Sequence, residues 1–343
     1  MTDFDAVIVG AGVAGCAAAV ELLSVGWRVG LLRKGTHMTR VESLSPGAVL
    51  HLNKLSIDVG QAVSEVVAWW GSEQEKRVIY PHSRMVERGR LADALRRRAL
   101  ERGATEEETK NDLSIERVGG RWRLAWEEPS AGPRRVTTAY LIDGSGRAAV
   151  VARRLGAKRA VVDQLFSIAV DIVEPRIVGT WTESRPTGWW NLSSLEEKGT
   201  LSFYSSALMV REVKSGVAAQ FEETEHLRTL LSTRRFLNST VSACGSSFLG
   251  PCAGPGWLAV GDAAWTAQPL ASVGVAKALR DARTLWYWLE HEWSRYDRFQ
   301  RAEFDAYLRQ LKQHYFLEKR WPTRPFGRLA HRLQATTSAP SRL

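Results

Sequence analysis

The sequence predicts an α/β fold, α+β overall, in which a Rossmann-like dinucleotide-binding domain is interleaved with an antiparallel β-sheet domain and followed by C-terminal helices. Three observations support this prediction. A buried strand and a glycine-rich turn open the chain, alternating strand patterns fill its middle, and a second buried strand appears near residue 260. Because nucleotide-binding patterns lie on both sides of the antiparallel region, one domain is expected to be inserted into the other.

The first element in the chain is a buried parallel strand. Residues 5–9 form a continuous apolar run, which is typical of such strands. Residues 13–25 follow as a helix of small and apolar residues, and residues 28–32 as a second strand. This β-α-β order predicts a doubly wound domain at the start of the chain.

The later elements alternate between sheet and helix patterns. In order, they are a charged amphipathic helix at 88–102, an antiparallel meander at 113–118, 121–127 and 134–142, strands at 166–173, 178–184 and 200–205, a buried strand at 256–262, a helical region at 273–320 and a disordered tail at 334–343.

Composition sets limits on the class of protein. Of 343 residues, 44% are hydrophobic and 24% charged, which is ordinary for a globular protein. No apolar run reaches the roughly 18 residues of a membrane span. The first residues lack the basic start of a signal peptide, so a cytoplasmic location and no membrane association are expected. Cys16, Cys244 and Cys252 are too few for a disulfide framework or a zinc site, so they are expected to be buried thiols and no metal site is predicted.

Charge and aromatic content bear on partners. The formal net charge is +10, and nine Lys or Arg residues face three acids from Arg301 to the end. Without a nucleic-acid motif, this excess indicates either an acidic protein or peptide partner or simply solubility. Fourteen tryptophans exceed the usual share and favour an aromatic-lined pocket.

The turn after the first strand reads Gly10-Ala11-Gly12-Val13-Ala14-Gly15. The first glycine permits the tight turn, the second lets the backbone approach a pyrophosphate, and the third lets the helix pack on the strand. The helix N-terminus then offers N–H groups to the phosphates. We therefore expect Gly10, Gly12, Val13, Ala14 and Gly15 to bind a dinucleotide.

The acid expected at the end of the second strand is absent. Arg33 and Lys34 occupy that place, where a carboxylate usually binds the ribose hydroxyls. Arg33 could accept a 2′-phosphate, stack on adenine or lie beside the pyrophosphate, and the sequence leaves these three roles open.

Three motifs together resemble the aromatic-hydroxylase superfamily, which has the p-hydroxybenzoate hydroxylase fold. They are Gly261-Asp262-Ala263-Ala264, the segment from Gln268 to Leu279, and Asp143-Gly144-Ser145-Gly146-Arg147. The resemblance implies FAD as the cofactor, with Asp262 on its ribitol side. It also implies that Gly261, Pro269, Val273, Gly274 and Val275 lie against the flavin.

Within this superfamily the chain is similar to the tryptophan-halogenase-like branch, which includes flavoproteins that mature tryptophylquinone cofactors. The likeness rests on four stretches, Arg40-Val41-Glu42-Ser43-Leu44-Ser45-Pro46, Val86-Glu87-Arg88, Gly188-Trp189-Trp190, and the segment from Glu318 to Phe326. It implies that Arg40 and Arg88 lie near the flavin.

The chain also departs from that branch. A glycine is missing after Val41, Gln268 stands where an aspartate is usual, and Trp189 begins a stretch that lacks the halogenase W-x-W-x-I-P pattern. Ala271 stands where halogenases have their catalytic glutamate. Halogenation is therefore not expected.

The resemblance implies a FAD-dependent monooxygenase. In such enzymes the reduced flavin captures O₂ as a C4a-hydroperoxide and transfers oxygen to an electron-rich ring, here an indole or tryptophan, either free or within a peptide or protein. Electrons would come from NAD(P)H or from a separate flavin reductase. Two alternatives stay open, a flavin dehydrogenase, oxidase or reductase on the same fold, and a non-catalytic flavoprotein-like partner.

No protein group is predicted to be catalytic, because the flavin performs the chemistry. Trp189 and Trp190 are candidates for substrate contact, although only one of two adjacent strand residues can face the pocket. His51 and His82 are the histidines nearest the flavin motifs in sequence, and each could be a base or simply a surface or hydrogen-bonded histidine. Of the two, His51 is a further candidate for substrate contact. Glu42 could act on a proton or hold Arg40.

These patterns predict a discontinuous domain arrangement. The FAD-binding domain comprises residues 1–70, 84–160 and 250–290, and the substrate domain comprises residues 71–83 and 161–249. Residues 291–343 form a C-terminal helical segment and tail.

Overall fold

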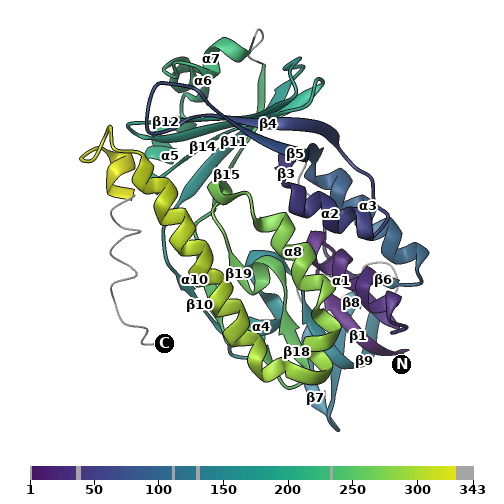
Figure 1. Cartoon of the computed structure of the whole chain (residues 1–343). Coiled ribbons are helices and arrows are strands. Elements are labelled where there is room, and N and C mark those ends of the chain that lie inside the picture. The colour runs from purple at the N-terminus through teal and green to yellow at the C-terminus, as the bar shows by residue number, and fades with distance from the viewer. Residues whose placement is uncertain (1, 36–39, 110–112, 129–131, 232–234, 330–343) are drawn as a thin grey trace.

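A computed structural model describes residues 2–35, 40–109, 113–128, 132–231 and 235–329. The predicted tail at 334–343 and residues 129–131, between two predicted strands of the meander, lie outside these ranges. The chain forms two parts, each around one large sheet, with a long C-terminal helix running along both (Figure 1). The part around the first sheet carries the predicted glycine-rich motif and is called the nucleotide-binding part below.

The first sheet contains the predicted β-α-β unit. Its main strands lie in the order β17-β18-β9-β1-β2-β6. Strand β1 pairs in parallel with both β2 and β9, and β9 pairs in parallel with β18. The bounds are β1 (Thr2–Val9), β2 (Val29–Arg33), β6 (Thr105–Glu108), β9 (Gly132–Asp143), β17 (Ala253–Gly254) and β18 (Trp257–Ala259).

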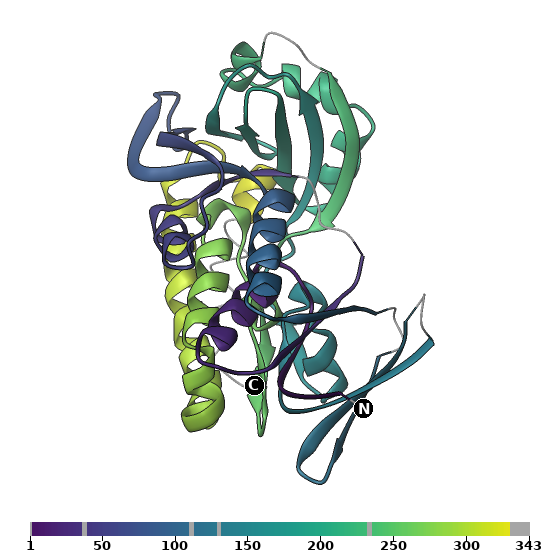
Figure 2. The same ribbon diagram turned by 90° about the vertical axis from the view of Figure 1, so that its right-hand side faces the viewer.

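The predicted antiparallel meander is present and extends this sheet. Strand β7 (Ser114–Val118) pairs with β8 (Arg121–Glu128), which pairs with β9. The hairpin projects from the nucleotide-binding part (Figure 2). Strand β9 therefore belongs both to the meander and to the parallel core of the sheet.

Helix α1 (Val13–Ser24) packs between α8 (Gly274–Arg283) and α3 (Arg88–Glu101). Its small side chains from Cys16 to Ala19 are fully buried, because neighbouring elements cover it on several sides. The helix ends where Gly26 takes a left-handed conformation, with φ of 86°.

The second sheet has eight strands in the order β15-β11-β14-β13-β12-β4-β5-β3, and all neighbours are antiparallel except β12 and β4. The bounds are β3 (Val41–Leu44), β4 (Gln61–Trp69), β5 (Lys76–Glu87), β11 (Phe166–Val173), β12 (Gly179–Arg185), β13 (Gly188–Ser194), β14 (Lys198–Ser205) and β15 (Phe236–Ala243).

Two strands of the second sheet come from residues that the sequence placed elsewhere. The predicted division put residues 1–70 in the nucleotide-binding domain, but β3 and β4 pair within the second sheet. Strand β5 likewise begins within the predicted segment 71–83, at Lys76, and runs past its end to Glu87. The domain division itself stays a prediction, because local patterns identify a strand without identifying its partner.

Both faces of the second sheet are covered at its middle strands, whereas the edge strand β15 is mostly exposed. Strands β13 and β14 are buried along nearly their whole length. Helices α5 (Ala207–Lys214), α6 (Val217–Glu222) and α7 (Leu227–Leu230) lie on the side away from the first sheet. The other face packs against the nucleotide-binding part and the C-terminal helix, so one hydrophobic core runs between the two parts.

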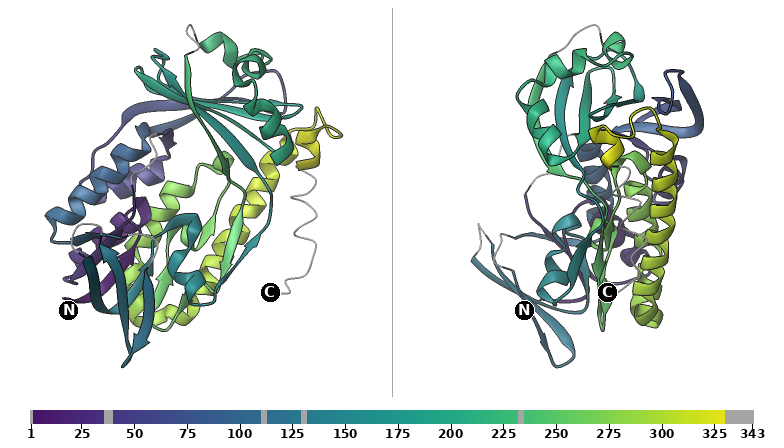
Figure 3. Two further views of the ribbon diagram at one scale, coloured as in Figure 1. Left: turned by 180° about the vertical axis from the view of Figure 1, so that it is seen from behind. Right: turned by 90° about the vertical axis from the view of Figure 1, so that its left-hand side faces the viewer.

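The predicted helical region at 273–320 is divided into four pieces. They are α8, α9 (Leu285–Tyr287), a π-helical turn η4 (Trp288–Glu292) and α10 (Trp293–Leu317). Residues spaced three or four apart on α10 are buried, from Tyr296 through Gln300 and Phe304 to Tyr315. Seen from behind, α10 reaches from the nucleotide-binding part to the second sheet (Figure 3).

Short elements join the two parts. Helix α2 (Pro46–Lys54) follows β3, and the Ser45 hydroxyl caps its N-terminus by accepting from the Ala48 amide at 3.4 Å. Strands β10 (Lys158–Val161), β16 (Ser247–Gly250) and β19 (Trp265–Thr266) form a small third sheet. The remaining pieces are α4 (Val150–Arg154), η1 (Gly146–Ala148), η2 (Gly261–Ala263) and η3 (Pro269–Ala271).

Two expectations from composition can be compared with the fold. The three cysteines are buried and unpaired, as predicted. Within the described residues, no helix combines the length and the apolar character that a membrane crossing requires.

Candidate cofactor and substrate site

A cavity of about 590 Å³ lies where the parallel strands β1, β2 and β9 end. In doubly wound sheets, ligands bind at this edge because helix N-termini and short loops meet there. Of the residues predicted to bind the cofactor, those that line the cavity are Gly10, Gly12, Val13, Ala14, Arg33, Lys34, Arg88, Asp262, Gly274 and Val275.

The glycine-rich turn leaves room for a ligand at one position and none at two others. A β-carbon on Gly12 would meet no atom within 4 Å, so this glycine leaves open space on the cavity side. A β-carbon on Gly15 would stand 1.8 Å from the carbonyl oxygen of Gly10. Gly15 therefore serves close packing of α1 on the strand, while Gly12 leaves the backbone open to a pyrophosphate.

Two helix N-termini meet at the cavity. Helix α1 begins after Gly12, and the amides of Val13 and Ala14 have no acceptor within the helix. Helix α8 begins at Gly274, which also lines the cavity. Both ends present N–H groups and the positive end of a helix dipole, so the cavity favours an anionic ligand.

Charged side chains reinforce this preference. Arg33, Lys34, Arg88 and Arg154 line the cavity, and Asp262 is the one carboxylate among the described lining residues. Three more cations than carboxylates suit a pyrophosphate, which carries two negative charges at neutral pH. These residues therefore fit a dinucleotide.

Arg33, which stands where the acid is missing after β2, pairs with acids of the neighbouring strand. Strand β6 pairs with β2 so that Glu108 lies opposite Arg33, and Arg33 Nη2 donates to Glu108 Oε2 at 3.1 Å. Glu106 of the same strand lies 3.9 Å from Arg33 Nε. These acids orient Arg33 along the rim of the cavity. The sequence could not show this, because β6 lies about seventy residues further along the chain.

Arg40 and Arg88 lie together, but Glu42 pairs with Arg88 and not with Arg40. Arg88 Nε donates to Glu42 Oε1 at 3.0 Å, and this carboxylate raises the pKa of Arg88. Arg40 Nη2 is buried and makes no hydrogen bond within the described residues, and burial lowers the pKa of Arg40. Arg40 does not line the cavity itself, although the Arg88 amide donates to its carbonyl at 2.8 Å.

The loop after β9 is shaped by a buried carboxylate. Asp143 Oδ1 accepts from the Ser145 amide at 3.0 Å, and Oδ2 accepts from the Ala152 amide at 2.9 Å. Burial raises the pKa of Asp143, and these hydrogen bonds oppose that change. Asp143 therefore holds the turn that brings Gly144 against Gly10, which is a structural role beside the cavity.

A buried polar network supports the turn of the Gly261-Asp262-Ala263-Ala264 motif, and the sequence analysis did not predict this network. Lys277 Nζ donates to the Gly261 carbonyl at 2.8 Å and to Asp281 Oδ2 at 2.5 Å. Asp281 in turn accepts from the Gly261 amide at 3.0 Å. The spacing of Lys277 and Asp281, four residues apart on one helix, is a sequence signal that could have indicated this pair.

Arg159 supports the same turn from the other side. Its Nη2 donates to the carbonyls of Asp262 and Ala263 at 3.1 and 2.7 Å. Burial lowers the pKa of Arg159. Together with Lys277, Arg159 fixes the backbone of η2, the turn that bears the cavity-lining residue Asp262.

Trp189 and Trp190 point to opposite faces of the second sheet. Trp189 stacks on Tyr204 with ring centroids 3.9 Å apart and belongs to the core between the two parts. Trp190 packs against Phe203 and Phe221 in the core beneath helices α5 to α7. Trp189 is therefore on the side of the nucleotide-binding part, and Trp190 is remote from it.

An aromatic cluster surrounds Trp189 on that side. Trp70 meets Trp189 edge to face at 6.3 Å and also contacts Tyr315 and Phe326. Phe326 ends the C-terminal stretch that resembles the halogenase-like branch, so this stretch completes the aromatic core behind Trp189.

Several predicted residues do not line the cavity. His51 is half-buried on α2, where burial and nearby cations lower its pKa. His82 is exposed on β5. Gly261 packs close to Ala14, where a β-carbon would stand 2.7 Å from the Ala14 side chain, and Pro269 and Val273 lie just before α8.

Comparisons with known proteins agree with this geometry. No family model matches the chain. LodB of Marinomonas mediterranea, provisionally assigned as a FAD-dependent oxidoreductase, is 25% identical over an alignment of 373 residues that covers 99% of this chain and 100% of LodB.

Solved structures match over nearly the whole chain. CmlS, a flavin-dependent halogenase, has a TM-score of 0.80 at 19% identity, covering 99% of this chain and 71% of CmlS. QhpG, a peptidyl tryptophan dihydroxylase essential for tryptophylquinone cofactor biogenesis, has a TM-score of 0.78 at 20% identity, covering 97% of this chain and 79% of QhpG. This chain has the fold of these flavin-dependent enzymes.

The predicted fold class and the predicted resemblance are thereby confirmed. The predicted cofactor, FAD, and the predicted enzyme class, an oxidoreductase, agree with the name of the relative LodB. The lining of the cavity also fits FAD. The roles of individual site residues stay predictions.

Proposed function

We propose that this chain is a FAD-dependent monooxygenase that hydroxylates an aromatic ring, in the first place an indole. The observation that supports this proposal is a series of residue contacts that leads from the cavity to the second sheet. Arg88 lines the cavity, and its amide donates to the Arg40 carbonyl at 2.8 Å. The next residue, Val41, donates its amide to Thr200 Oγ1 at 2.9 Å on β14, the strand that carries Tyr204, and Tyr204 stacks on Trp189. Hydrogen bonds therefore join the wall of the cavity to the strand that carries this buried aromatic stack.

Bound FAD supplies the electrons that activate O₂ for insertion into the substrate. The protein contributes position and environment. Gly12 leaves the backbone open to the pyrophosphate, and the N-terminus of α8 offers its positive end to an anionic ring. The buried Trp189 and its aromatic neighbours exclude water from the side where an aromatic substrate is expected.

Hydroxylation is favoured over halogenation for one specific reason. Structural neighbours include enzymes of both kinds. Ala271 ends η3 just before α8, where the resemblance places the glutamate of halogenases. A methyl group cannot exchange a proton or form an ion pair, so the residue that a halogenating species needs is absent here.

We further propose that the indole belongs to a tryptophan within an acidic peptide or protein. The neighbour QhpG acts on peptidyl tryptophan, and basic residues exceed acidic ones threefold from Arg301 onward. Such an excess attracts an acidic partner and raises the encounter rate, and salt weakens the attraction.

The test is oxygen incorporation under ¹⁸O₂. The FAD-loaded protein is supplied with either NADPH or a separate flavin reductase and offered free tryptophan, simple indoles and acidic tryptophan-bearing peptides. A product heavier by one or two ¹⁸O atoms is expected from a peptide. Substrate oxidation without ¹⁸O would instead identify a dehydrogenase or oxidase, and a protein that never binds FAD would identify a non-catalytic partner.

A further inference from the structure

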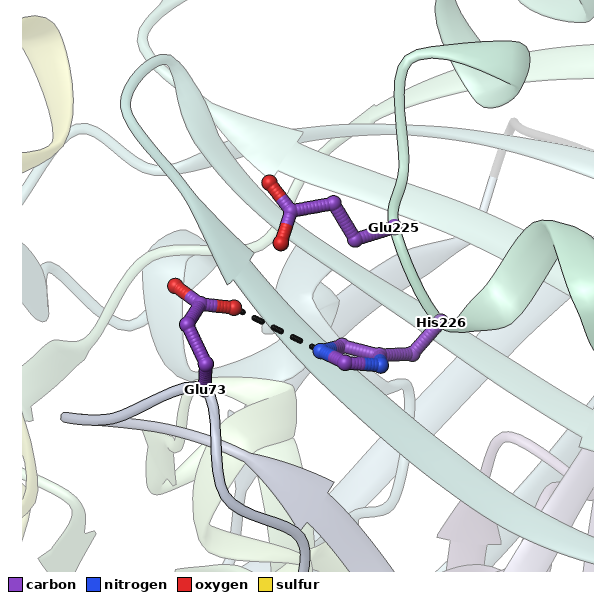
Figure 4. A group of neighbouring side chains, drawn as sticks. All are labelled: Glu73, Glu225 and His226. Atoms are coloured by element: carbon purple, nitrogen blue, oxygen red, sulfur yellow. Dashed lines mark hydrogen bonds and ion pairs between the residues drawn. The ribbon is translucent and has the colours of Figure 1, made fainter.

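We propose that Glu73, Glu225 and His226 form a binding site for a divalent transition-metal ion, best matched by Zn²⁺, beside the ends of strands β4 and β12 of the second sheet. Each residue offers one ligand atom, and these three atoms lie within 4.8 Å of one another. The three side chains converge from two separate segments, the turn between β4 and β5 and the loop before α7 (Figure 4).

The loop that bears two of the ligands is held by a buried carboxylate. Glu183 on β12 accepts from the amides of Glu225, His226 and Leu227 at 2.8, 3.1 and 2.9 Å. Glu183 is 1% exposed, so it orders the backbone without being available as a ligand. The ligand side chains therefore project from a backbone that is already in place.

The imidazole of His226 is also oriented before any ion binds. It stacks on the Trp69 ring with centroids 4.6 Å apart and planes 8° apart. Its Nε2 atom lies 3.4 Å from Glu73 Oε2. Stacking fixes the ring plane and directs Nε2 toward the carboxylates, as a metal-binding histidine requires.

Each ligand carboxylate is held through its other oxygen. Glu73 Oε1 accepts from Arg320 Nη1, and Glu225 Oε1 accepts from Arg185 Nη1 at 2.5 Å. The second oxygen of Glu73 faces His226 Nε2, and the ligand oxygen of Glu225 lies within 4.8 Å of both ligand atoms. Arginines in this arrangement orient the carboxylates, but they also compete with a metal ion for the carboxylate charge. We therefore expect this site to bind Zn²⁺ more weakly than a buried structural zinc site does.

Charge within this network favours a divalent cation. The ion pairs and hydrogen bonds connect four carboxylates to two guanidinium groups, which leaves two negative charges when His226 is neutral. The carboxylates are Glu73, Glu183, Glu225 and Glu318, and the guanidinium groups are Arg185 and Arg320. A divalent ion balances that excess.

The donor set selects the class of metal. One imidazole nitrogen with two carboxylate oxygens suits Zn²⁺ and related transition ions, whereas Ca²⁺ and Mg²⁺ prefer oxygen ligands alone. The ion would fasten the turn after Trp69 to the loop before α7. Trp70 follows Trp69 and packs on Trp189, so the ion would stiffen the side of the sheet where substrate is proposed to bind.

The experiment titrates Zn²⁺ into the full-length, FAD-loaded protein after removal of metals, in competition with a chromophoric chelator. One Zn²⁺ per chain is expected. Because a ligand is lost, His226→Ala and Glu73→Gln should each weaken binding at least about 100-fold. Co²⁺ in place of Zn²⁺ should give a visible absorption spectrum that His226→Ala abolishes.

One surface glutamate and one surface histidine outside the proposed site serve as matched controls. Glu75 belongs to the same turn but pairs with Arg77, and His291 is an exposed histidine 3.8 Å from one carboxylate, Glu290. Glu75→Gln and His291→Ala should bind Zn²⁺ as the wild type does. If His226→Ala loses its fold, judged by FAD content and circular dichroism, Glu225→Gln takes its place. No Zn²⁺ binding by the wild type, or equal loss in the controls, would overturn the proposal.

Discussion

The backbones of Gly10 and Gly144 meet so closely that a β-carbon on Gly10 would stand 2.5 Å from the Gly144 carbonyl oxygen. This contact joins the loops after β1 and β9 and forms the floor of the cofactor cavity. The glycines around it therefore have different tasks, and substitutions can separate them.

Gly12→Asp should leave the fold intact and abolish FAD binding. The new side chain has open space and an ordinary backbone, with φ of −77°, but its carboxylate would face the pyrophosphate. We expect FAD affinity to fall by at least about 100-fold, since like charges in contact cost several kcal/mol. Fluorescence titration with FAD measures this. Gly15→Ala should instead lower the free energy of unfolding, by about 3 kcal/mol, because of overpacking. A full flavin spectrum in Gly12→Asp would contradict the assignment.

Arg88→Gln should weaken FAD binding by about 10- to 100-fold, the usual cost of losing a hydrogen bond from a charged donor. Arg88 lines the cavity and is directed by Glu42. Arg90 provides the control, because it lies on the same helix, is 73% exposed and pairs with Glu87. Titration of Arg90→Gln should give an affinity within about twofold of wild type. Equal losses in both variants would point to bulk charge instead of a specific contact.

Trp189→Leu should raise the KM for the aromatic substrate and leave the Kd for FAD unchanged. Trp190→Leu removes a ring of similar size from the opposite face and should affect stability alone, by about 3 kcal/mol. Steady-state kinetics at a temperature where both variants are folded make the comparison. The substrate surface would have to be sought elsewhere if both variants showed the same KM.

No halogenated product is expected when reduced flavin, O₂ and chloride or bromide are supplied together with an indole substrate. The reason is Ala271, which cannot replace the catalytic glutamate of halogenases. Mass spectrometry of the products decides the matter, with a flavin-dependent halogenase as positive control. A chlorinated or brominated indole would contradict this prediction.

Glu318 should contribute to stability at neutral pH and lose that contribution in acid. Burial alone would raise the pKa of Glu318, but hydrogen bonds from Arg320, Ser184 and the Gly71 amide outweigh burial and lower the pKa to about 2. The contribution is complete above the unfolded value of 4.5 and disappears as the pH falls toward 2.

Glu318→Gln should therefore lower the free energy of unfolding by about 2–3 kcal/mol at pH 7. Urea denaturation at pH 7 and near pH 3 measures the difference, which should shrink as the pH falls. Glu75→Gln is the control, since Glu75 is a surface acid of the neighbouring turn and should give nearly equal stability at both values. A difference independent of pH would show that packing, and not charge, is the source.

The sequence alone was sufficient for the nucleotide-binding start, the meander, the C-terminal helices and the family of folds. These features depend on short-range requirements. Glycines two and three residues apart permit one turn, and alternating or helical periodicity reports which face of an element is buried. For the same reason, most of the predicted residues of the first glycine motif were found around the cavity.

The tertiary structure decided everything that depends on which segments meet. Strand β3 and strand β4 pair within the second sheet. Arg33 pairs with Glu108, and Glu42 pairs with Arg88 instead of Arg40. All three results depend on how the strands are paired and in which register. The cluster of Glu73 with His226 joins residues more than 150 positions apart, where the sequence predicted no metal site. Contacts of this range depend on how whole sheets pack, and no local pattern of residues records that packing.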